Sequence, residues 1–442
     1  MVLTVKTGEK NTWVEYCNQT NRLDDLIILE QDGNYHFDFL DYEYNRSGDG
    51  SGITDNIVNV LKTVIHAGKS EQGQVANEGF WEDALDMLLF NVVDLCVLAH
   101  GKLKIDDLYL AVQNLPKSKS DVVQPTSDAD DPFAQILYQA KLNVARQAEQ
   151  RKRIFKKNNP DKRFEVKSDK GLASFKKVMH YFMSDFPGLS DKTRSVVEHS
   201  FFGLLFRLIR EPIKSLICSP TPNFSPDDCF NGKIILINLP IKQFDKVGRD
   251  AQILFKYVWQ RAMERRTTDN NKMPVFLWAD EAQNFLHEHD IDYQATARSS
   301  KVCTVYLTQN LPNYFAHLGG RSGEFQVKSF LGTMGTKIFH ANADMETNKY
   351  ASDLIGQQEI WKENKGSQFV GGFTMSEGTS QDRDFVIHPE DFTAMRTGGP
   401  INKYLVDARI HRQGMPWFST TRNDRKISFK QSINNNKKRG ES

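Results

Sequence analysis

Hydrophobic residues recur with two different spacings along this chain. Near the start, Val2–Lys6 and Asp25–Glu30 are short apolar runs typical of buried strands, and Lys10–Gln19 between them has the spacing of a helix. The same alternation returns after Gly232. There it predicts strands over 233–238, 275–279, 302–307, 336–341 and 403–409, and helices over 249–266 and 345–355. Two α/β segments of this kind predict one sheet covered by helices.

The middle of the chain follows a different pattern. From about Trp81 to Phe206 only helical spacing is found, and a helix is also predicted just before it, over 56–66. The fold class that accounts for both patterns is an α/β domain interrupted by an all-α insertion domain. We place the N-terminal part of the α/β domain at 1–80, the insertion at 81–206, the C-terminal part at 207–425 and a disordered tail at 426–442.

Composition sets few limits on function. The chain is 39% hydrophobic and 26% charged with a formal net charge of +1, which is typical of a soluble protein and shows no overall basic excess. The five cysteines are scattered without a Cys-x-x-Cys pair, which favours a reducing compartment and neither disulfides nor zinc. The most apolar helix, over 80–99, contains Asp83, Asp86, Asn91 and Asp94, so we expect no membrane span.

The strand predicted at Val275–Ala279 ends in two adjacent carboxylates, Asp280 and Glu281. A buried strand that delivers Asp-Glu at its carboxyl end suits one side of a P-loop nucleotide site. There the Asp holds Mg²⁺, directly or through water, and the Glu polarises the attacking water. The alternative is a buried strand followed by a solvated turn.

The next strand, Val302–Leu307, is followed by Thr308 and Gln309, a polar pair that can contact the γ-phosphate and position water. Arg298 lies between the two strands and could reach a phosphate across a subunit interface. This order of features indicates the RecA-like motor group of P-loop proteins. A DEAD/DEAH-box helicase is the less favoured alternative, because Thr-Gln stands where those enzymes have Ser-Ala-Thr.

The loop that cradles phosphates, Gly-x-x-x-x-Gly-Lys-[Ser/Thr], is not found in the sequence. The tripeptide Gly68-Lys69-Ser70 is preceded by Thr63 where the pattern needs glycine, and we expect it to cap the helix over 56–66. A second short motif, His287-Glu288-His289-Asp290, resembles a metal site but lacks the His-Glu-x-x-His spacing, so a loop is favoured.

A basic segment lies inside the predicted insertion. Between Lys141 and Lys177 there are 13 Lys/Arg and 4 Asp/Glu, interspersed with Phe155, Phe164 and Phe175. Such a segment can neutralise phosphates of DNA. The alternative is a solvated helix surface. The residues proposed for DNA contact are Arg151, Lys152, Arg153, Lys156 and Lys157.

Together these features resemble a known family. The chain is similar to the conjugative type IV coupling proteins of the TraD/TraG kind, which group with the HerA/FtsK motor ATPases. The similarity covers nearly the whole chain and is strongest from Gly232 to Gly356. It is carried by the Asp280-Glu281 strand, the Arg298-Ser-Ser-Lys segment, Thr308-Gln309-Asn, the run from Gly335 to Ala351, and the early strands at Leu3–Glu9 and Asp25 onward. The resemblance implies a RecA-like nucleotide-binding domain with a helical insertion.

The resemblance also implies roles for single residues. Asp280 would serve Mg²⁺, Glu281 would activate water and Gln309 would sense the γ-phosphate. Arg298 would act as an arginine finger in a homo-hexameric ring, and Arg321 is a weaker candidate for a second interface cation. Members of the family pass single-stranded DNA and a relaxase to the channel of a type IV secretion system, at the cytoplasmic face of the inner membrane.

Two departures from the family qualify this expectation. Membrane helices and the phosphate loop precede the first strand in the family, and neither is found between Met1 and Ser442. We therefore expect Met1 to lie inside a longer reading frame or the chain to be a truncated product, with ATP and Mg²⁺ bound only when the loop is present. Two functions stay open: a DNA-pumping ATPase, and a non-catalytic subunit that recruits substrates to a DNA-transfer complex.

Overall fold

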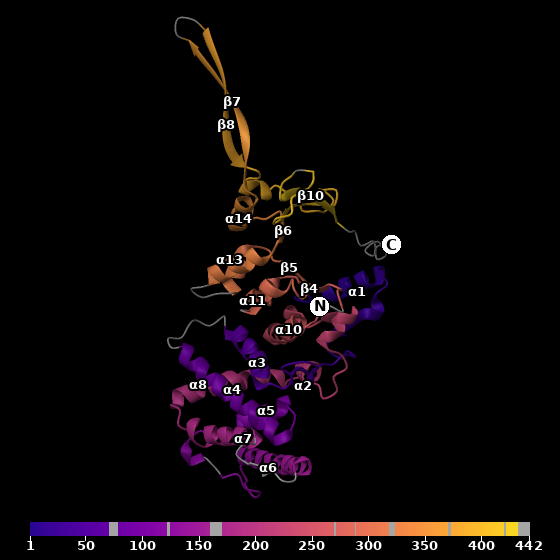
Figure 1. The fold of residues 1–442 in the computed structure, drawn as a ribbon. Helices are drawn as coiled ribbons and strands as arrows, with labels where there is room; N and C mark the ends of the chain where they lie inside the picture. Colours follow the sequence, from indigo (N-terminus) through magenta and orange to yellow (C-terminus); the bar gives the residue numbers. More distant parts are fainter. Residues whose placement is uncertain are drawn as a thin grey trace. The chain divides into compact units, whose positions relative to one another are not determined.

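The protein is described here by a computed structural model that covers residues 1–69, 78–121, 124–159, 170–268, 271–287, 289–317, 323–369, 373–419 and 421–431. It forms two compact units, Met1–Leu307 and Thr308–Ser442. The boundary falls directly after the last strand of the first unit's sheet, inside the segment 207–425 that the sequence suggested as one part of a domain (Figure 1).

A parallel sheet organises the first unit. Its strands are β1 (Val2–Leu3), β2 (Leu26–Leu29), β3 (Ile234–Ile237), β4 (Val275–Ala279) and β5 (Val302–Tyr306), in the order β2-β3-β1-β4-β5. Three strands of the second predicted α/β segment thus join the two strands of the first in one sheet, whereas the strands predicted at 336–341 and 403–409 lie in another sheet. The fold class expected from the sequence, an α/β domain with a helical insertion, is confirmed.

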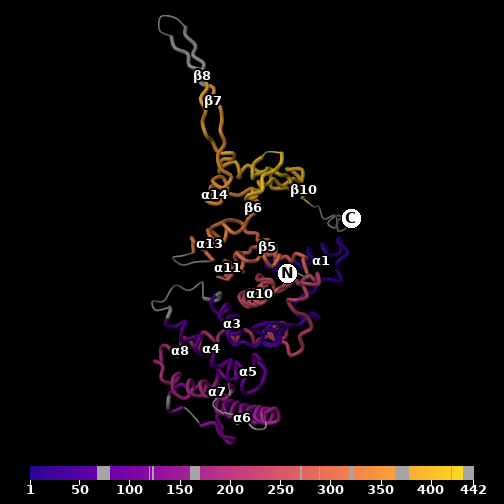
Figure 2. The backbone as a smooth tube through the Cα atoms, in the orientation of Figure 1, coloured from indigo at the N-terminus to yellow at the C-terminus, as the bar shows by residue number. Residues whose placement is uncertain are grey.

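The start of the chain lies in the middle of this sheet. Val2 pairs with Leu236 on one side and with Trp278 on the other, and the Met1 amino group donates to the Phe276 carbonyl at 2.6 Å. The tube in Figure 2 shows the N-terminus beside α10 (Ile241–Glu264). That helix is almost entirely buried from residue 250 onward, and its polar side chains Gln252, Lys256 and Gln260 are buried with the apolar ones.

Between β2 and β3 the described chain is helical. The helices are α2 (Phe39–Asn45), α3 (Thr54–Lys69), α4 (Glu78–His100), α5 (Ile105–Gln113), α6 (Pro132–Asn158), α7 (Lys170–His180), α8 (Asp191–Leu208) and α9 (Ile213–Ile217). The apolar helix α4 is central, with Leu88, Leu89 and Val92 fully buried. Among the described helices none is alone long and apolar enough to span a membrane, and one pair, bent by 117°, meets that criterion jointly.

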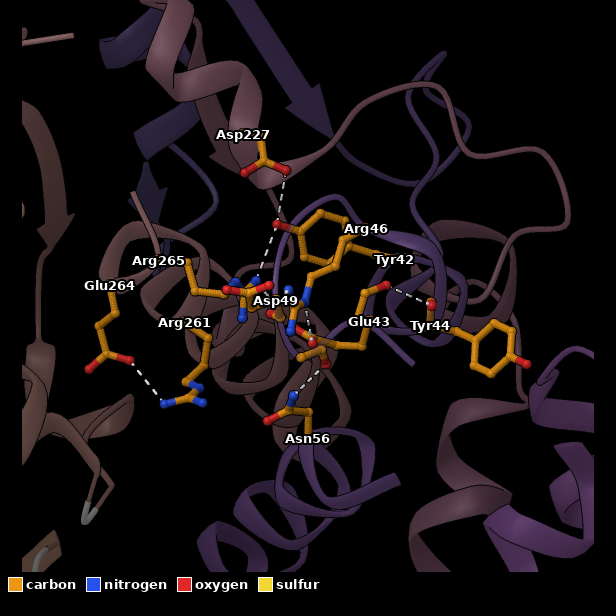
Figure 3. A network of polar contacts seen from close by, with 12 residues as sticks. Tyr42, Glu43, Tyr44, Arg46, Asp49, Asn56, Asp227, Arg261, Glu264 and Arg265 are labelled. Carbon is orange, nitrogen blue, oxygen red and sulfur yellow. Dashed lines mark hydrogen bonds and ion pairs between the residues drawn. The ribbon is translucent and has the colours of Figure 1, made fainter. Parts of the chain in front are cut away.

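A buried polar network joins this helical part to the end of α10 (Figure 3). Glu43 on α2 pairs with Arg46 at 3.0 Å and with Arg265 at 3.6 Å, and the side chains of Glu43 and Arg46 are each only 3% exposed. The Tyr42 hydroxyl donates to Asp227 at 2.9 Å. Burial and the Asp227 charge raise the pKa of Tyr42, so the phenol keeps the proton that it donates.

The second unit contains a small antiparallel sheet in the order β10-β9-β6, formed by β6 (Thr336–His340), β9 (Leu405–Arg412) and β10 (Asp424–Lys430). Helices α12 (Leu311–His317) and α13 (Gly323–Thr333) precede β6, and α14 (Met345–Ile355) follows it. Phe339 of β6 packs onto a core formed by Ala351, Ile355, Ile387, Phe392 and Met395.

Two features of this unit were not expected from the sequence. A long hairpin, β7 (Gln357–Phe369) and β8 (Phe373–Phe385), follows α14 directly. The disordered tail expected at 426–442 is wrong over its first residues, because 426–430 belong to β10; 432–442 lie outside the described residues. Antiparallel pairing with β9 supplies the hydrogen bonds that order this polar strand.

Candidate nucleotide-binding site

The acidic pair predicted from the sequence lies at the carboxyl end of β4. Glu281 has φ 49° and ψ 47°, a left-handed conformation that is uncommon for residues other than glycine and costs on the order of 1 kcal/mol. Its side chain is 11% exposed, and Gln283 donates to its Oε2 at 2.9 Å. Asp280 accepts the Glu281 amide at 3.0 Å. The turn therefore aims two carboxylates away from the strand and fixes one of them.

Lys6 completes this group, and sequence reasoning missed it. The residue follows β1, which neighbours β4 in the sheet, and its Nζ lies 3.4 Å from Asp280 Oδ2 and 3.5 Å from Glu281 Oε1. Partial burial lowers the pKa of Lys6, but the two carboxylates raise it by more, so the ammonium form is favoured. A lysine after the first apolar run was visible in the sequence, but the strand order that brings it to Asp280 was not.

Two neighbours hold the backbone that leads to Lys6. The carboxylate of Glu9, in the first turn of α1 (Glu9–Gln19), accepts the main-chain N–H groups of Val5 at 3.1 Å and Lys6 at 3.2 Å. On the other side Gln252 of α10 accepts from the Thr4 amide at 2.8 Å and donates to the Thr4 carbonyl at 2.9 Å. Lys6 is thus presented by a fixed turn rather than a free loop.

One helical turn further along α10, Lys256 holds the segment that follows the acidic pair. Its Nζ is fully buried and donates to the Phe285 carbonyl at 2.6 Å and to Asp290 at 2.5 Å. Gln260, another turn on, donates to Asp290 at 2.7 Å, and the His287 amide does so at 2.8 Å. Buried charges persist where they are paired and fully hydrogen-bonded, as here.

The His-Glu-His-Asp motif therefore serves packing in the described structure. His287 is buried against Asp290, and burial lowers its pKa to about 3, so the ring is neutral. His289 and Asp290 open helix α11 (His289–Thr296), where a loop was favoured, and Glu288 lies outside the described residues. Among the described residues no group of three His, Cys, Asp or Glu is placed to hold a metal. An Mg²⁺ ion bound with a nucleotide needs fewer protein ligands than this, because phosphate oxygens and water supply most of its ligands.

Arg298, another predicted site residue, lies apart from this group. Arg298 is exposed in the turn before β5, hence at the amino edge of the sheet, whereas Asp280 and Glu281 lie at the carboxyl edge. Parallel five-residue strands separate the two edges by about 16 Å. Thr308 and Gln309 begin the second unit, where the Gln309 carbonyl accepts from Asn342 at 2.7 Å.

Two further sequence hypotheses concern loops and charge. Helix α3 continues to Lys69, three residues beyond its predicted end, so Gly68 and Lys69 are helical and do not form a phosphate loop. Arg321 lies outside the described residues. The five basic residues proposed for DNA contact lie in the last turns of α6, where Arg153 pairs with Glu149 at 3.6 Å.

One segment of the chain matches a known family model. Residues 274–397, which include both carboxylates and Arg298, match the family model described as the TraM recognition site of TraD and TraG. No curated protein sequence matches the chain.

Solved structures show which fold the chain shares. The chain is similar to the bacterial conjugative coupling protein TrwBdeltaN70 in an unbound form, with a TM-score of 0.57 at 12% identity over 98% of this chain and 85% of that one. It is equally similar to TrwB in complex with ADP and Mg²⁺, with a TM-score of 0.56 at 12% identity over 98% and 84% of the two chains. The expected resemblance to conjugative coupling proteins, with a RecA-like fold, is confirmed.

Proposed function

We propose that this chain supplies the acidic side of an ATP site in a DNA-transfer motor of the coupling-protein kind. The observation that carries the proposal is the turn after β4, where Glu281 is held in a left-handed conformation and oriented by Gln283. Strained backbone that fixes a carboxylate at a sheet edge is typical of catalytic sites. Asp280 would hold Mg²⁺ through water, and Glu281 would orient the attacking water.

ATP hydrolysis would drive single-stranded DNA, with its relaxase, toward a type IV secretion channel at the cytoplasmic face of the inner membrane. Gln309 and Thr308 would contact the γ-phosphate, and the active assembly would be a homo-hexamer. In support, TrwB, whose fold this chain shares, has been solved with ADP and Mg²⁺ and with a non-hydrolysable GTP analogue. We further propose 1–80 and 81–206 as the first α/β part and the helical insertion, with the C-terminal part, 207–425, divided after Leu307 and extended through β10 to Lys430. Arg321 is proposed as a second interface cation.

The test uses Glu281→Gln. Because residues 1–442 contain no phosphate loop, we expect no measurable ATP turnover from this polypeptide alone. In a polypeptide that also carries a phosphate loop, Glu281→Gln should retain nucleotide binding and lose hydrolysis, because it removes only the group that orients water. Turnover by residues 1–442 that Glu281→Gln abolishes would show that another phosphate cradle exists.

DNA contact through α6 is tested by reversing Arg151, Lys152 and Arg153 to Glu. The exposed end of this helix should contact phosphates without reading sequence, so the reversal should weaken binding of a single-stranded oligonucleotide at low salt. It should also flatten the salt dependence by about 0.7 per lost contact. Unchanged affinity and slope would leave α6 a solvated surface.

A second function is favoured by one observation. The matched family model is described as a recognition site for TraM, and it covers residues 274–397. A non-catalytic recruitment subunit would use this segment to dock a partner and would need no phosphate loop. Measured binding to a TraM-type protein that survives Glu281→Gln and loss of nucleotide would favour this alternative.

A further inference from the structure

The small sheet of the second unit divides its charges between its two faces. The segment from Arg396 to Lys430 has eight Lys/Arg and two acidic residues, Asp407 and Asp424. The register pairs Asp424 with His411 and Ser428 with Asp407, so both carboxylates lie on one face of the sheet. We call the opposite face the Trp417 face. It is formed by Thr336, Ile338, His340, Val406, Ala408, Ile410, Arg412, Arg425, Ile427 and Phe429, with Trp417 at its edge.

Local cations already neutralise the two acids. Asp407 accepts from Arg396 at 2.7 and 3.0 Å, and Asp424 pairs with Arg409 at 3.0 Å and with Arg422 at 2.8 Å. The acids are therefore satisfied on their own face.

The cations of the Trp417 face are held differently. Within the described part of the chain no carboxylate pairs with Arg412 or Arg425. Their guanidinium carbons lie 4.8 and 5.5 Å from the Trp417 ring centroid. The indole face thus attracts two like charges that would otherwise repel each other. The loop that carries Trp417 is closed by main-chain hydrogen bonds from Trp417 to Arg422 and from Arg412 to Asn423.

Exposed apolar groups lie beside these cations. Phe429 is 42% exposed on the same side of β10 as Arg425, and its ring lies 6.1 Å from that of His340. Ile338 is 50% exposed opposite Ile410. A sheet face with two arginines, exposed aromatic rings and no acid is complementary to a polyanion that carries flat apolar groups.

We propose that the Trp417 face binds single-stranded nucleic acid. Arg412 and Arg425 contact backbone phosphates, and unstacked bases lie on Phe429 and His340. A duplex is disfavoured because its bases are already stacked and cannot cover the exposed rings. The inference rests on the proposed function only in taking nucleic acid as cargo; it adds a site on the second unit, separate from α6.

The test measures anisotropy of a labelled oligo-dT over several salt concentrations. Arg412→Gln with Arg425→Gln should weaken binding at least about tenfold at low salt and reduce the salt slope by about 1.4. Phe429→Ala should weaken binding without changing the slope. The matched control is Lys426→Gln with Lys430→Gln, which removes the same charge from the opposite face of β10. Circular dichroism confirms that each variant is folded.

The outcomes separate this inference from the proposed function. An equal effect of the control pair, or no effect of the arginine pair, overturns the inference. If only the α6 reversal abolishes oligonucleotide binding, the inference about the Trp417 face is also wrong, but the proposed DNA-binding function stands. If wild-type protein binds vesicles of anionic phospholipid in the same arginine-dependent way but not oligo-dT, the face is a membrane contact and the inference is wrong. Photocrosslinking from 5-iodouracil to Phe429 or Trp417 would support it independently of affinity.

Discussion

The ammonium group of Lys6 lies 3.4 Å from the carboxylate of Asp280, although 274 residues separate them in the chain. The contact exists because β1 and β4 are neighbours in a parallel sheet, so that their carboxyl ends meet at one edge. A cation at this place lowers the repulsion between Asp280 and Glu281. It also competes with any divalent ion for the same oxygens.

Removing Lys6 should therefore tighten divalent-ion binding. We expect Lys6→Gln to raise the affinity of residues 1–442 for Mn²⁺, used as a paramagnetic substitute for Mg²⁺, by about two- to fivefold. The effect is small because the Lys6 side chain is 55% exposed and solvent screens the pair. Electron paramagnetic resonance of free Mn²⁺ measures the change. Lys10→Gln is the control, because Lys10 pairs with Glu30 at 2.7 Å instead; an equal change in both variants would contradict the assignment.

The local parts of this site were predictable from the sequence, but its assembly was not. A short apolar run predicted strand β4 and the two acids that follow it. Helical spacing predicted both ends of α14. Strand order depends on contacts between residues more than 200 positions apart, which local periodicity does not contain. Sequence reasoning therefore found Glu281 but not Lys6.

The hairpin and β10 were missed for a different reason. Strands are recognised in sequence by an apolar face, and the described base of the hairpin has little of one. Trp361 is 69% exposed, and Lys362 pairs with Asp382 on the other face. Residues of this kind form strands through pairing with a neighbouring strand rather than through burial, and nothing in their own spacing indicates it.

The buried pair of Lys256 and Asp290 gives a prediction about stability. Lys256→Met should lower the free energy of unfolding by about 3–5 kcal/mol, because it leaves the Asp290 charge buried without its partner. Lys256→Met with Asp290→Asn should recover part of the loss. Urea denaturation followed by circular dichroism measures both. If the double variant is no more stable than the single one, the lysine acts mainly through the Phe285 carbonyl.

Asp38 should make stability depend on pH in an unusual direction. It caps α2 by accepting the Leu40 and Asp41 amides, yet burial raises its pKa from 3.8 to about 6. The folded state thus binds a proton more tightly than the unfolded one, so this group's contribution falls as pH rises from about 4 through 6. Asp38→Asn keeps an amide-accepting cap and should be more stable than wild type at pH 8, by on the order of 2 kcal/mol. The difference should vanish at pH 4; a variant that is less stable at both values would contradict this.

Arg298 cannot reach the acidic pair of its own chain, because it lies at the opposite edge of the sheet. Its proposed role as an arginine finger therefore requires a second copy of the chain. In a polypeptide that also has a phosphate loop, Arg298→Ala should lower kcat on the order of 10³-fold and spare nucleotide affinity. The measurement is ATP turnover with a parallel nucleotide-binding titration.

Mixing of subunits distinguishes this role from a structural one. A ring made from Arg298→Ala and Glu281→Gln subunits contains interfaces that combine an intact Arg298 with an intact Glu281, so turnover should partly return. Subunits that each act alone give no such recovery at any mixing ratio. Arg298→Lys is the further control, since lysine keeps the charge but loses the planar fork that holds two phosphate oxygens, and it should restore little. Full activity in Arg298→Lys would point to simple charge, and loss of folding in Arg298→Ala would point to a structural arginine in the turn before β5.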